Sequence, residues 1–286
     1  MEARVSSVDC RLSTVDSGMS LLVPPRHPTR ELLDDQNLPF EEMIRSLADI
    51  DRVNRKWGAS HALEKHLLAR IRNAPLRSSA PAFAEPASAG EGRSLRSTSS
   101  AGKDFLLLDV GAGSGALAGR LEDVLSRDGS RVHVIALDLQ WRHLRAGRAG
   151  ANGSSAVAGD AFLLPLGDAA VDWIVSTLIF HHFSPEQNVL LLREFARVAR
   201  RGFALLDLRR HLFPLLFVSI AGPLLFESRA SVADGPASVR QAYTQPEAEQ
   251  IAREAWPGTK VERVFPFRLL ITGPGCCELK VHAGRP

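Results

Sequence analysis

A glycine-rich turn between an apolar stretch and a helical stretch constrains this chain more than any other feature. The apolar residues FLLL at 105–108 lead into DVGAGSGA at 109–116, and LAGRL follows. Such a turn joins a buried strand to a helix, and its small residues let a ligand approach the backbone and the helix N-terminus. The pattern therefore predicts a strand–turn–helix unit that binds a nucleotide-like molecule.

Strand and helix patterns alternate along the rest of the sequence. Apolar stretches typical of buried strands lie at 105–110, 132–139, 172–178, 203–208 and, as two short strands, in KVERVFPFRLLITG near the C-terminus. Amphipathic stretches typical of helices lie between them, at 116–127, 184–200 and 246–256. Ser184 with Gln187, and Thr244 with Glu247, have the spacing of capping boxes. This alternation predicts an α/β fold with a mainly parallel sheet and helices on both faces.

The residues before this pattern divide into three parts. Residues 1–30 are mixed and aperiodic, so we expect a disordered leader. Apolar residues at helical spacing predict two helices within 31–73, and Gly58 separates them. The segment 74–103 is dominated by Ala, Ser, Pro and Gly and predicts a flexible linker to the main domain at 104–286.

Composition narrows the classes of partner. The chain has 286 residues and a net charge of +3, but its basic residues are scattered and form no stripe, so we expect no nucleic-acid binding. Its three cysteines (Cys10, Cys276 and Cys277) form no disulfide framework, and the first 20 residues lack the apolar centre of a signal peptide. These features predict a cytoplasmic protein.

The longest apolar run is LFPLLFVSIAGPLLF at 212–226. It is shorter than a bilayer span and is interrupted by Pro214 and Pro223. We therefore expect a buried helix rather than a membrane anchor, and no stable membrane insertion. Such a helix could provide an apolar wall for a lipophilic ligand.

The glycine turn itself fits two ligand patterns. The dinucleotide fingerprint G-x-G-x-x-G/A is matched by Gly111, Gly113 and Ala116. The D/E-x-G-x-G-x-G turn of enzymes that use S-adenosylmethionine (SAM) is matched by Asp109, Gly111, Gly113 and Gly115. Asp138, at the end of the second predicted strand, can accept both ribose hydroxyls of either cofactor. The turn and Asp138 alone leave both cofactors open.

A third element separates the two cofactors. Gly159, Asp160 and Ala161 stand just before LPLGDAAVDWIVS. The ordered set of motifs resembles the class I SAM-dependent methyltransferases over residues 105–272, and the resemblance implies a Rossmann-like, seven-stranded sheet with SAM as cofactor. It also implies that Asp160 bonds the adenine amino group next to Ala161, that Asp138 holds the ribose, that Leu139 packs on adenine and that Asp109 helps to place the methionine amine.

Two adjacent histidines, His181 and His182, follow the strand predicted at 172–178. Methyl transfer to a hydroxyl benefits from a general base. A phenol, with a pKa of about 10, needs only modest help from a histidine. We therefore predict either histidine as the base. A similar His-His pair in methyltransferases of the quinone pathways, whose acceptor is a ring carbon, leaves a loop-shaping role open. We expect no metal site, because no acidic partner with ligand spacing is apparent.

Three further stretches resemble small-molecule methyltransferases of bacterial secondary metabolism. They are RSLADIDRVNRKWG at 45–58, DLRR at 207–210 and DGPASVRQAYT at 234–244. This resemblance implies that the helices within 31–73 form a lid, and that Arg210, Arg240 and Tyr243 contact the acceptor. The hypothesis is O-methylation of a small, lipophilic, aromatic or polyketide-like hydroxyl compound. The alternatives are C-methylation of a quinone-type ring, an NAD(P)-dependent oxidoreductase, and a non-catalytic scaffold or sensor with the same fold. The oligomeric state remains open.

Overall fold

The computed structural model describes residues 22–57, 59–72, 104–127, 130–147 and 155–277. The predicted linker at 74–103 and the first 21 residues of the predicted leader lie outside these ranges. The strands are β1 (Asp104–Val110), β2 (Arg131–Asp138), β3 (Ser155–Ala158), β4 (Val171–Thr177), β5 (Ala199–Leu208), β6 (Lys260–Val264) and β7 (Arg268–Pro274). The helices are α1 (Phe40–Lys56), α2 (Ala59–Arg72), α3 (Ala116–Ser126), α4 (Trp141–Ala146), α5 (Pro185–Val198), α6 (Leu212–Leu225), α7 (Arg229–Gln241) and α8 (Gln245–Ala255), with short 3-10 turns η1 (Leu32–Asp34) and η2 (Phe180–His182).

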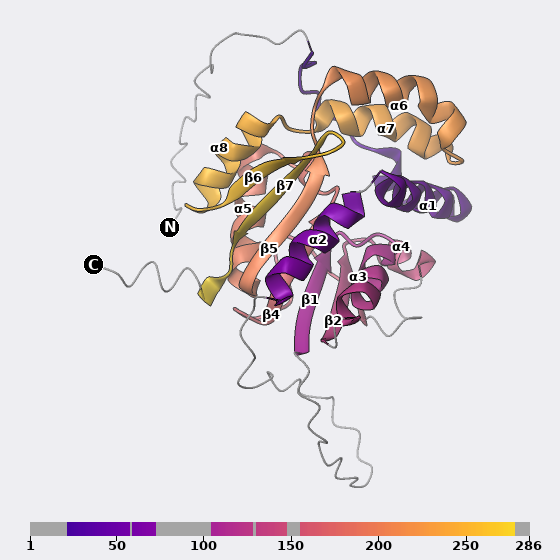
Figure 1. Cartoon of the computed structure of the whole chain (residues 1–286). Helices are drawn as coiled ribbons and strands as arrows, with labels where there is room; N and C mark the ends of the chain where they lie inside the picture. Colours follow the sequence, from indigo (N-terminus) through magenta and orange to yellow (C-terminus); the bar gives the residue numbers. More distant parts are fainter. Residues whose placement is uncertain (1–21, 58, 73–103, 128–129, 148–154, 278–286) are drawn as a thin grey trace, which may run out of the picture.

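The seven strands form one sheet in the order β3-β2-β1-β4-β5-β7-β6 (Figure 1). Neighbouring strands from β3 to β5 are parallel, and β7 runs antiparallel to both β5 and β6. This topology confirms the predicted Rossmann-like, mainly parallel, seven-stranded fold. Since parallel strands end at the same edge, the segments after β1, β2 and β4 meet there.

Side chains of the central strand alternate between two cores, as they must when both faces of a sheet are covered. Leu108 and Val110 of β1 pack in one cluster with Phe195 of α5. Phe105 and Leu107 pack in another cluster with residues of α3. Helices α5 and α8 therefore cover one face, while α2 and α3 cover the other (Figure 1).

Helix α2 is part of this second layer. Leu63 and Leu67 are fully buried in the same core cluster as Leu107 of β1 and Leu121 of α3. The predicted lid over 31–73 is therefore not confirmed as a unit, because α2 belongs to the body of the domain while only α1 borders the pocket described below. Helical spacing predicts that a helix buries one face, but it does not say which surface covers that face.

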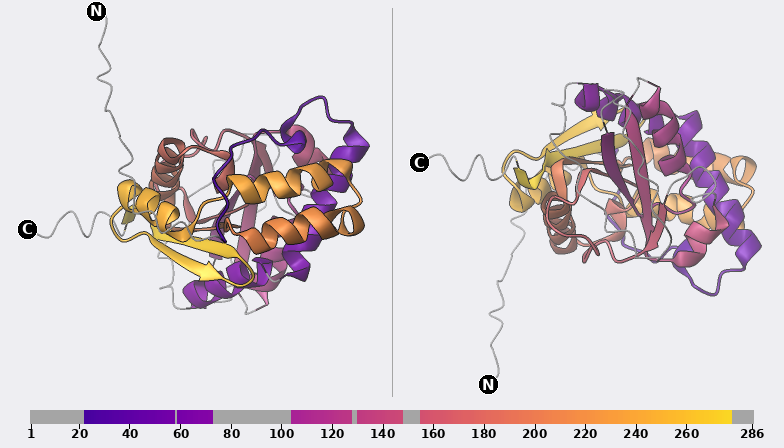
Figure 2. Two further views of the ribbon diagram at one scale, coloured as in Figure 1. Left: turned by 90° about the horizontal axis from the view of Figure 1, so that it is seen from above. Right: turned by 90° about the horizontal axis from the view of Figure 1, so that it is seen from below.

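The segment before α1 is bonded to the rest of the molecule. Arg26 donates hydrogen bonds to the carbonyl oxygens of Gln241 (2.7 Å) and Phe183 (3.0 Å), and its guanidinium lies 4.1 Å from the centre of the Tyr243 ring. Residues 22–30, which we expected within a disordered leader, thus cross the carboxyl end of the sheet beside α7 (Figure 2). Long-range hydrogen bonds hold the segment there, although its sequence has no regular spacing of apolar residues that would predict an ordered element.

Helix α6 departs from the prediction in its environment. The run at 212–226 does form a helix, but Phe213, Ile220 and Leu224 are 60%, 74% and 89% exposed, and only Leu215 and Gly222 are buried. One side of α6 packs on α7 beyond the carboxyl end of the sheet (Figure 1). On the other side Trp57 lies against Phe217 with 5.2 Å between the ring centres, but most of the apolar side chains there stay exposed. The expectation of a buried helix was therefore wrong. Within the described ranges, no apolar helix reaches the length that a bilayer crossing requires.

Candidate functional site

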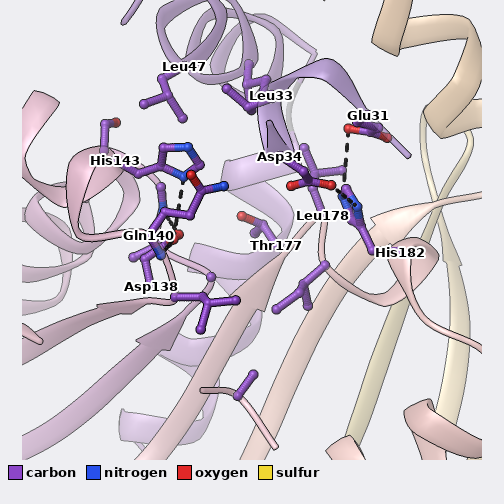
Figure 3. A pocket seen from close by; sticks show the side chains of 18 of the residues that line it. Glu31, Leu33, Asp34, Leu47, Asp138, Gln140, His143, Thr177, Leu178 and His182 are labelled. Atoms are coloured by element: carbon purple, nitrogen blue, oxygen red, sulfur yellow. Dashed lines mark hydrogen bonds and ion pairs between the residues drawn. The ribbon is translucent and has the colours of Figure 1, made fainter. Parts of the chain in front are cut away.

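A cavity of about 610 Å³ opens at the carboxyl end of the sheet. The glycine turn after β1 and the residues after β2 line one end, and η2 with its two histidines lines the other. Residues 30–36 and helix α1, which contributes Leu47, lie across from the strand ends (Figure 3). The sheet thus brings the predicted cofactor motif and the predicted histidine pair into one pocket.

The glycine turn needs glycine for conformational reasons. Gly111, Gly113 and Gly115 have φ angles of 70°, 54° and 71°, in the left-handed region that other residues rarely adopt. A Cβ atom on Gly111 would also lie 3.0 Å from Ile179 Cδ1, and one on Gly113 would lie 3.2 Å from Leu47 Cδ2. The backbone is therefore open toward the pocket, as a closely bound ligand requires.

Asp138 fastens the turn to the end of β2. Its Oδ2 accepts a hydrogen bond from the Gly113 N–H and its Oδ1 accepts one from the Gln140 N–H, both at 2.8 Å. His143 Nδ1 lies 3.5 Å from Oδ1 (Figure 3). Each carboxylate oxygen can accept a further bond, so the predicted ribose contact remains chemically available.

The other predicted cofactor residues are distributed around the same end of the pocket. Asp160, Ala161 and Leu139 line it, and Leu139 is 72% exposed, so its side chain is free to contact a ligand. Asp160 Oδ1 accepts a hydrogen bond from the Phe162 N–H at 2.9 Å, and this local bond fixes the carboxylate. Gly115 lies just behind the lining, where it begins α3.

Asp109 is buried beneath the turn, and neither of its carboxylate oxygens has a hydrogen-bond partner among the described residues. Burial and, to a lesser degree, the charge of Asp138 raise its pKa to about 8. A carboxylate without a cationic partner is unfavourable in such a place. The residues present fit SAM, because its methionine portion carries an ammonium group and its ribose and adenine match the polar groups around the turn.

The opposite end of the pocket is a network of buried charges. His181 Nδ1 lies 2.6 Å from Asp207 Oδ1 at the end of β5, and His181 Nε2 lies 3.4 Å from Glu31 Oε1. Burial alone would lower the pKa of His181, but the charges and hydrogen bonds of Asp207 and Glu31 outweigh it and raise the pKa to about 10. His181 is therefore an imidazolium at neutral pH, held between two carboxylates.

His182 faces the pocket beside this network. Its side chain is 23% exposed, its Nδ1 lies 3.3 Å from Asp34 Oδ2, and its Nε2 lies 3.8 Å from Glu31 Oε2 (Figure 3). Asp34 lies beside Nδ1, and this contact favours the tautomer in which Nδ1 carries the proton and Nε2 the lone pair.

Glu31, His181 and His182 also form a group whose ligand atoms lie within 4.8 Å of one another, as a metal site would require. Glu31 Oε1, however, already accepts hydrogen bonds from the Gln241 amide (2.6 Å) and the Ser238 hydroxyl (2.5 Å). Burial would raise the pKa of Glu31, but the hydrogen bond and positive charge of His181, with the bond from Ser238, outweigh it and lower the pKa to about 2. Since protein groups satisfy the carboxylates, we interpret the group as an ion-pair network.

Sequence reasoning did not find Glu31, Asp34 or Asp207. Glu31 and Asp34 lie in a segment without periodicity, and no local pattern marks them as neighbours of the histidines. Asp207 carried a signal that could have been used. It ends a predicted parallel strand next to β4, so its side chain was bound to lie at the ligand-binding edge.

The three predicted acceptor contacts lie elsewhere. Arg210 is buried, donates to the Ala242 carbonyl oxygen at 2.7 Å and pairs with Glu247 at 2.6 Å. The Tyr243 hydroxyl donates to the Phe183 carbonyl oxygen at 2.6 Å. Arg240 is exposed on α7. Arg210, Tyr243 and Arg240 are not among the residues that line the described pocket, so their roles as substrate contacts remain predictions.

The fold and the cofactor end of this pocket are those of an α/β domain that binds a nucleoside at the edge of a parallel sheet. Residues 107–202 match the family described as "Methyltransferase domain". Residues 107–202 are therefore similar to a methyltransferase domain, and the residues around the glycine turn fit SAM as its cofactor.

A curated relative is the malonyl-[acyl-carrier protein] O-methyltransferase of Methylococcus capsulatus, which is 37% identical over 99 residues. That stretch covers 34% of this chain and spans about a third, 34%, of the relative's length.

Two solved structures are similar to this chain. A candidate SAM-dependent methyltransferase from Methanococcus maripaludis is 13% identical, with a TM-score of 0.50 over 84% of this chain and 96% of that chain. The magnesium protoporphyrin IX methyltransferase of Synechocystis, with bound SAH, is 16% identical, with a TM-score of 0.41 over 60% of this chain and 74% of that chain.

Proposed function

We propose that this protein transfers a methyl group from SAM to a hydroxyl of a small, lipophilic, aromatic or polyketide-like acceptor. The observation that carries the proposal is the presence of His182 in the same pocket as the glycine turn. When bound, SAM supplies an activated methyl group, so the protein has to align the acceptor, exclude water and receive one proton.

The two ends of the pocket divide this work. The glycine turn, Asp138 and Asp160 would hold the nucleoside, and Asp109, which is protonated in the unliganded protein, would release its proton and balance the ammonium charge. Residues of α1 and of the segment at 30–36 face the strand ends and shield the pocket from water. The acceptor then lies against the histidine pair, where Leu33 and Ile179 provide apolar contacts in the lining.

His182 is the general base in this proposal, and Nε2 is the atom that receives the proton. Asp34 orients the ring through Nδ1, and Glu31 lies close enough to stabilise the charged product. His181 is a positioning residue, because its pKa of about 10 keeps it protonated at neutral pH. Its charge holds Glu31 and Asp207 in place on either side.

The name of the curated relative supports transfer to oxygen, because that protein is an O-methyltransferase. Transfer to a ring carbon would leave the proton on carbon after the methyl group has been added, which requires a base at another position. The histidine beside a carboxylate fits a hydroxyl, whose proton points toward the lone pair of Nε2.

The test is turnover with isotopically labelled SAM on a panel of phenols and hydroquinones, with the methylated atom identified by NMR. We expect a methoxy product. His182→Gln should lower kcat by about 10²- to 10⁴-fold, the usual contribution of a general base, and should leave SAM affinity unchanged.

The matched control is His133→Gln, which changes an exposed histidine on β2 away from the pocket. It should retain full activity. Full turnover by His182→Gln would remove His182 as the base. A ring-methyl product, or binding of SAM without methylation of any acceptor in the panel, would contradict the proposed reaction.

A further inference from the structure

Helix α6 presents an apolar stripe on its outward side. Its exposed large side chains recur at helical spacing along that side, and they are Phe213, Leu216, Phe217, Ile220 and Leu224. The outward side of a surface helix is normally polar, but Ser219 is the only residue of α6 with a polar side chain. The opposite side of α6 packs on α7.

The stripe continues onto the turn between β6 and β7. The Phe213 ring stacks against Phe267 with 6.4 Å between the ring centres. Phe265, two residues earlier in the same turn, is 89% exposed. The exposed side chains of α6 and of this turn, joined through Phe213 and Phe267, together form what we call the α6 surface. An exposed apolar surface of this extent marks a place of interaction.

Positive charge borders the α6 surface at the same turn. Arg209 lies with its guanidinium 5.1 Å from the centre of the Phe267 ring, and Arg263 is exposed at the end of β6. The two arginines are close enough for the charge of Arg263, together with burial, to lower the pKa of Arg209. Apolar side chains next to arginines are complementary to acyl chains beneath anionic headgroups.

The size of the surface argues against a second copy of the chain as its partner. A stable protein interface takes about 20 to 30 residues from each side, whereas the α6 surface consists of one side of a 14-residue helix and one turn. A lipid surface has no such requirement, because a few apolar side chains and nearby cationic groups suffice for reversible binding.

We propose that the α6 surface binds the face of an anionic lipid bilayer, with Phe213, Ile220, Leu224 and Phe265 entering the acyl region while Arg209 and Arg263 contact the headgroups. The helix would lie along the bilayer rather than cross it, since it has 14 residues. Helix α7, on which α6 packs, also contributes Ser238 to the pocket, so the bound face would lie one helix away from the methyl-transfer site.

The test is flotation of the full chain with vesicles of phosphatidylcholine or of phosphatidylcholine mixed with phosphatidylglycerol. We expect binding to the mixed vesicles. The double variant Phe213→Ser with Ile220→Ser should reduce the partition coefficient by about 10-fold or more. Arg263→Gln should reduce it by about 5-fold, the effect of one cationic group near an anionic surface.

The matched control is Leu190→Ser, because Leu190 is a single exposed leucine (56%) on α5, on another side of the molecule. It should bind vesicles like the unchanged chain. SAM binding and circular dichroism check that each variant is folded, and neither requires turnover, so failure of the proposed reaction would not affect this test.

Absence of vesicle binding by the unchanged chain would overturn the proposal. An equal loss caused by Leu190→Ser would also overturn it. A third contrary result is a dimer in light scattering that the double variant converts to a monomer, without any vesicle binding. In that case a second copy covers the α6 surface.

Discussion

The two ends of the pocket are built in different ways. At the cofactor end, the polar groups stand at the ends of adjacent parallel strands, and backbone N–H groups hold the carboxylates of Asp138 and Asp160. At the acceptor end, Glu31, His181 and Asp207 come from distant parts of the chain, and charge pairing holds them together. The first end depends on strand geometry, while the second depends on a balance of buried charges.

The largest expected effect comes from the acceptor end. Asp207→Ala leaves the imidazolium of His181 without its nearest partner, and it removes the acceptor for the Phe180 and His181 N–H groups. We expect the free energy of unfolding in urea to fall by about 3–5 kcal/mol. Asp168→Ala is the control, because Asp168 pairs with Arg197 at the surface, and it should cost about 1 kcal/mol or less. Equal losses would show that the charge network has no special role in stability.

The next effect concerns the cofactor end. Asp138→Ala and Asp160→Ala should each weaken SAM binding by about 1–3 kcal/mol if the carboxylates bond the ribose and adenine. Calorimetric titration with SAM measures this, and Asp168→Ala again serves as the control. The Asp138 change should also lower the melting temperature, because it frees the Gly113 N–H. Unchanged SAM affinity in either variant would remove that residue from the cofactor site.

The smallest expected effects are on the pH dependence of stability, which differs between the two ends of the pocket. The pKa of Asp109 rises from 3.8 to about 8, so the folded protein keeps a proton that the unfolded chain releases, and the free energy of unfolding falls as pH rises through that range. The pKa of His181 rises from 6.5 to about 10, so its contribution is complete below pH 6.5 and is lost as pH rises toward 10. Each slope is at most about 1.4 kcal/mol per pH unit.

Urea unfolding at a series of pH values measures both slopes. Asp109→Asn should flatten the profile between about pH 4 and 8 only, and His181→Gln should flatten it between about pH 6.5 and 10 only. The lowered pKa values of Glu31 and Asp207 act below pH 4.5, so they overlap only the acidic edge of the Asp109 window. A profile that Asp109→Asn does not change would contradict a neutral, buried Asp109.

The sequence predicted the fold and the cofactor end because their signals are local. Runs of apolar residues predict the strands, and the Ser184–Gln187 capping box begins α5 as expected. The end of each parallel strand then determines where the next residues lie, so the turn and Asp138 could be placed together without coordinates.

The acceptor end and the helix environments depend on tertiary contacts instead. Nothing near Glu31 in the sequence indicates His181 as its neighbour. The apolar run of α6 indicated burial, but its exposure depends on whether another element covers it. Helix α2 shows the same limit, because Leu63 and Leu67 indicate a buried face without indicating the sheet as its partner.

The hydrogen bonds of Arg26 and the ion pairs of Glu31 have a consequence for how such a domain can diversify. They make residues 22–36 a separately encoded wall of the pocket, contributed by the chain before the first strand. Replacing this segment by another would change the shape and charge of the proposed acceptor side of the pocket. The residues at the strand ends, which are proposed to hold the nucleoside, would stay the same. On the proposed function, this part of the acceptor side can therefore change without any change at the strand ends, while Ile179 and the histidine pair keep the rest of the acceptor side.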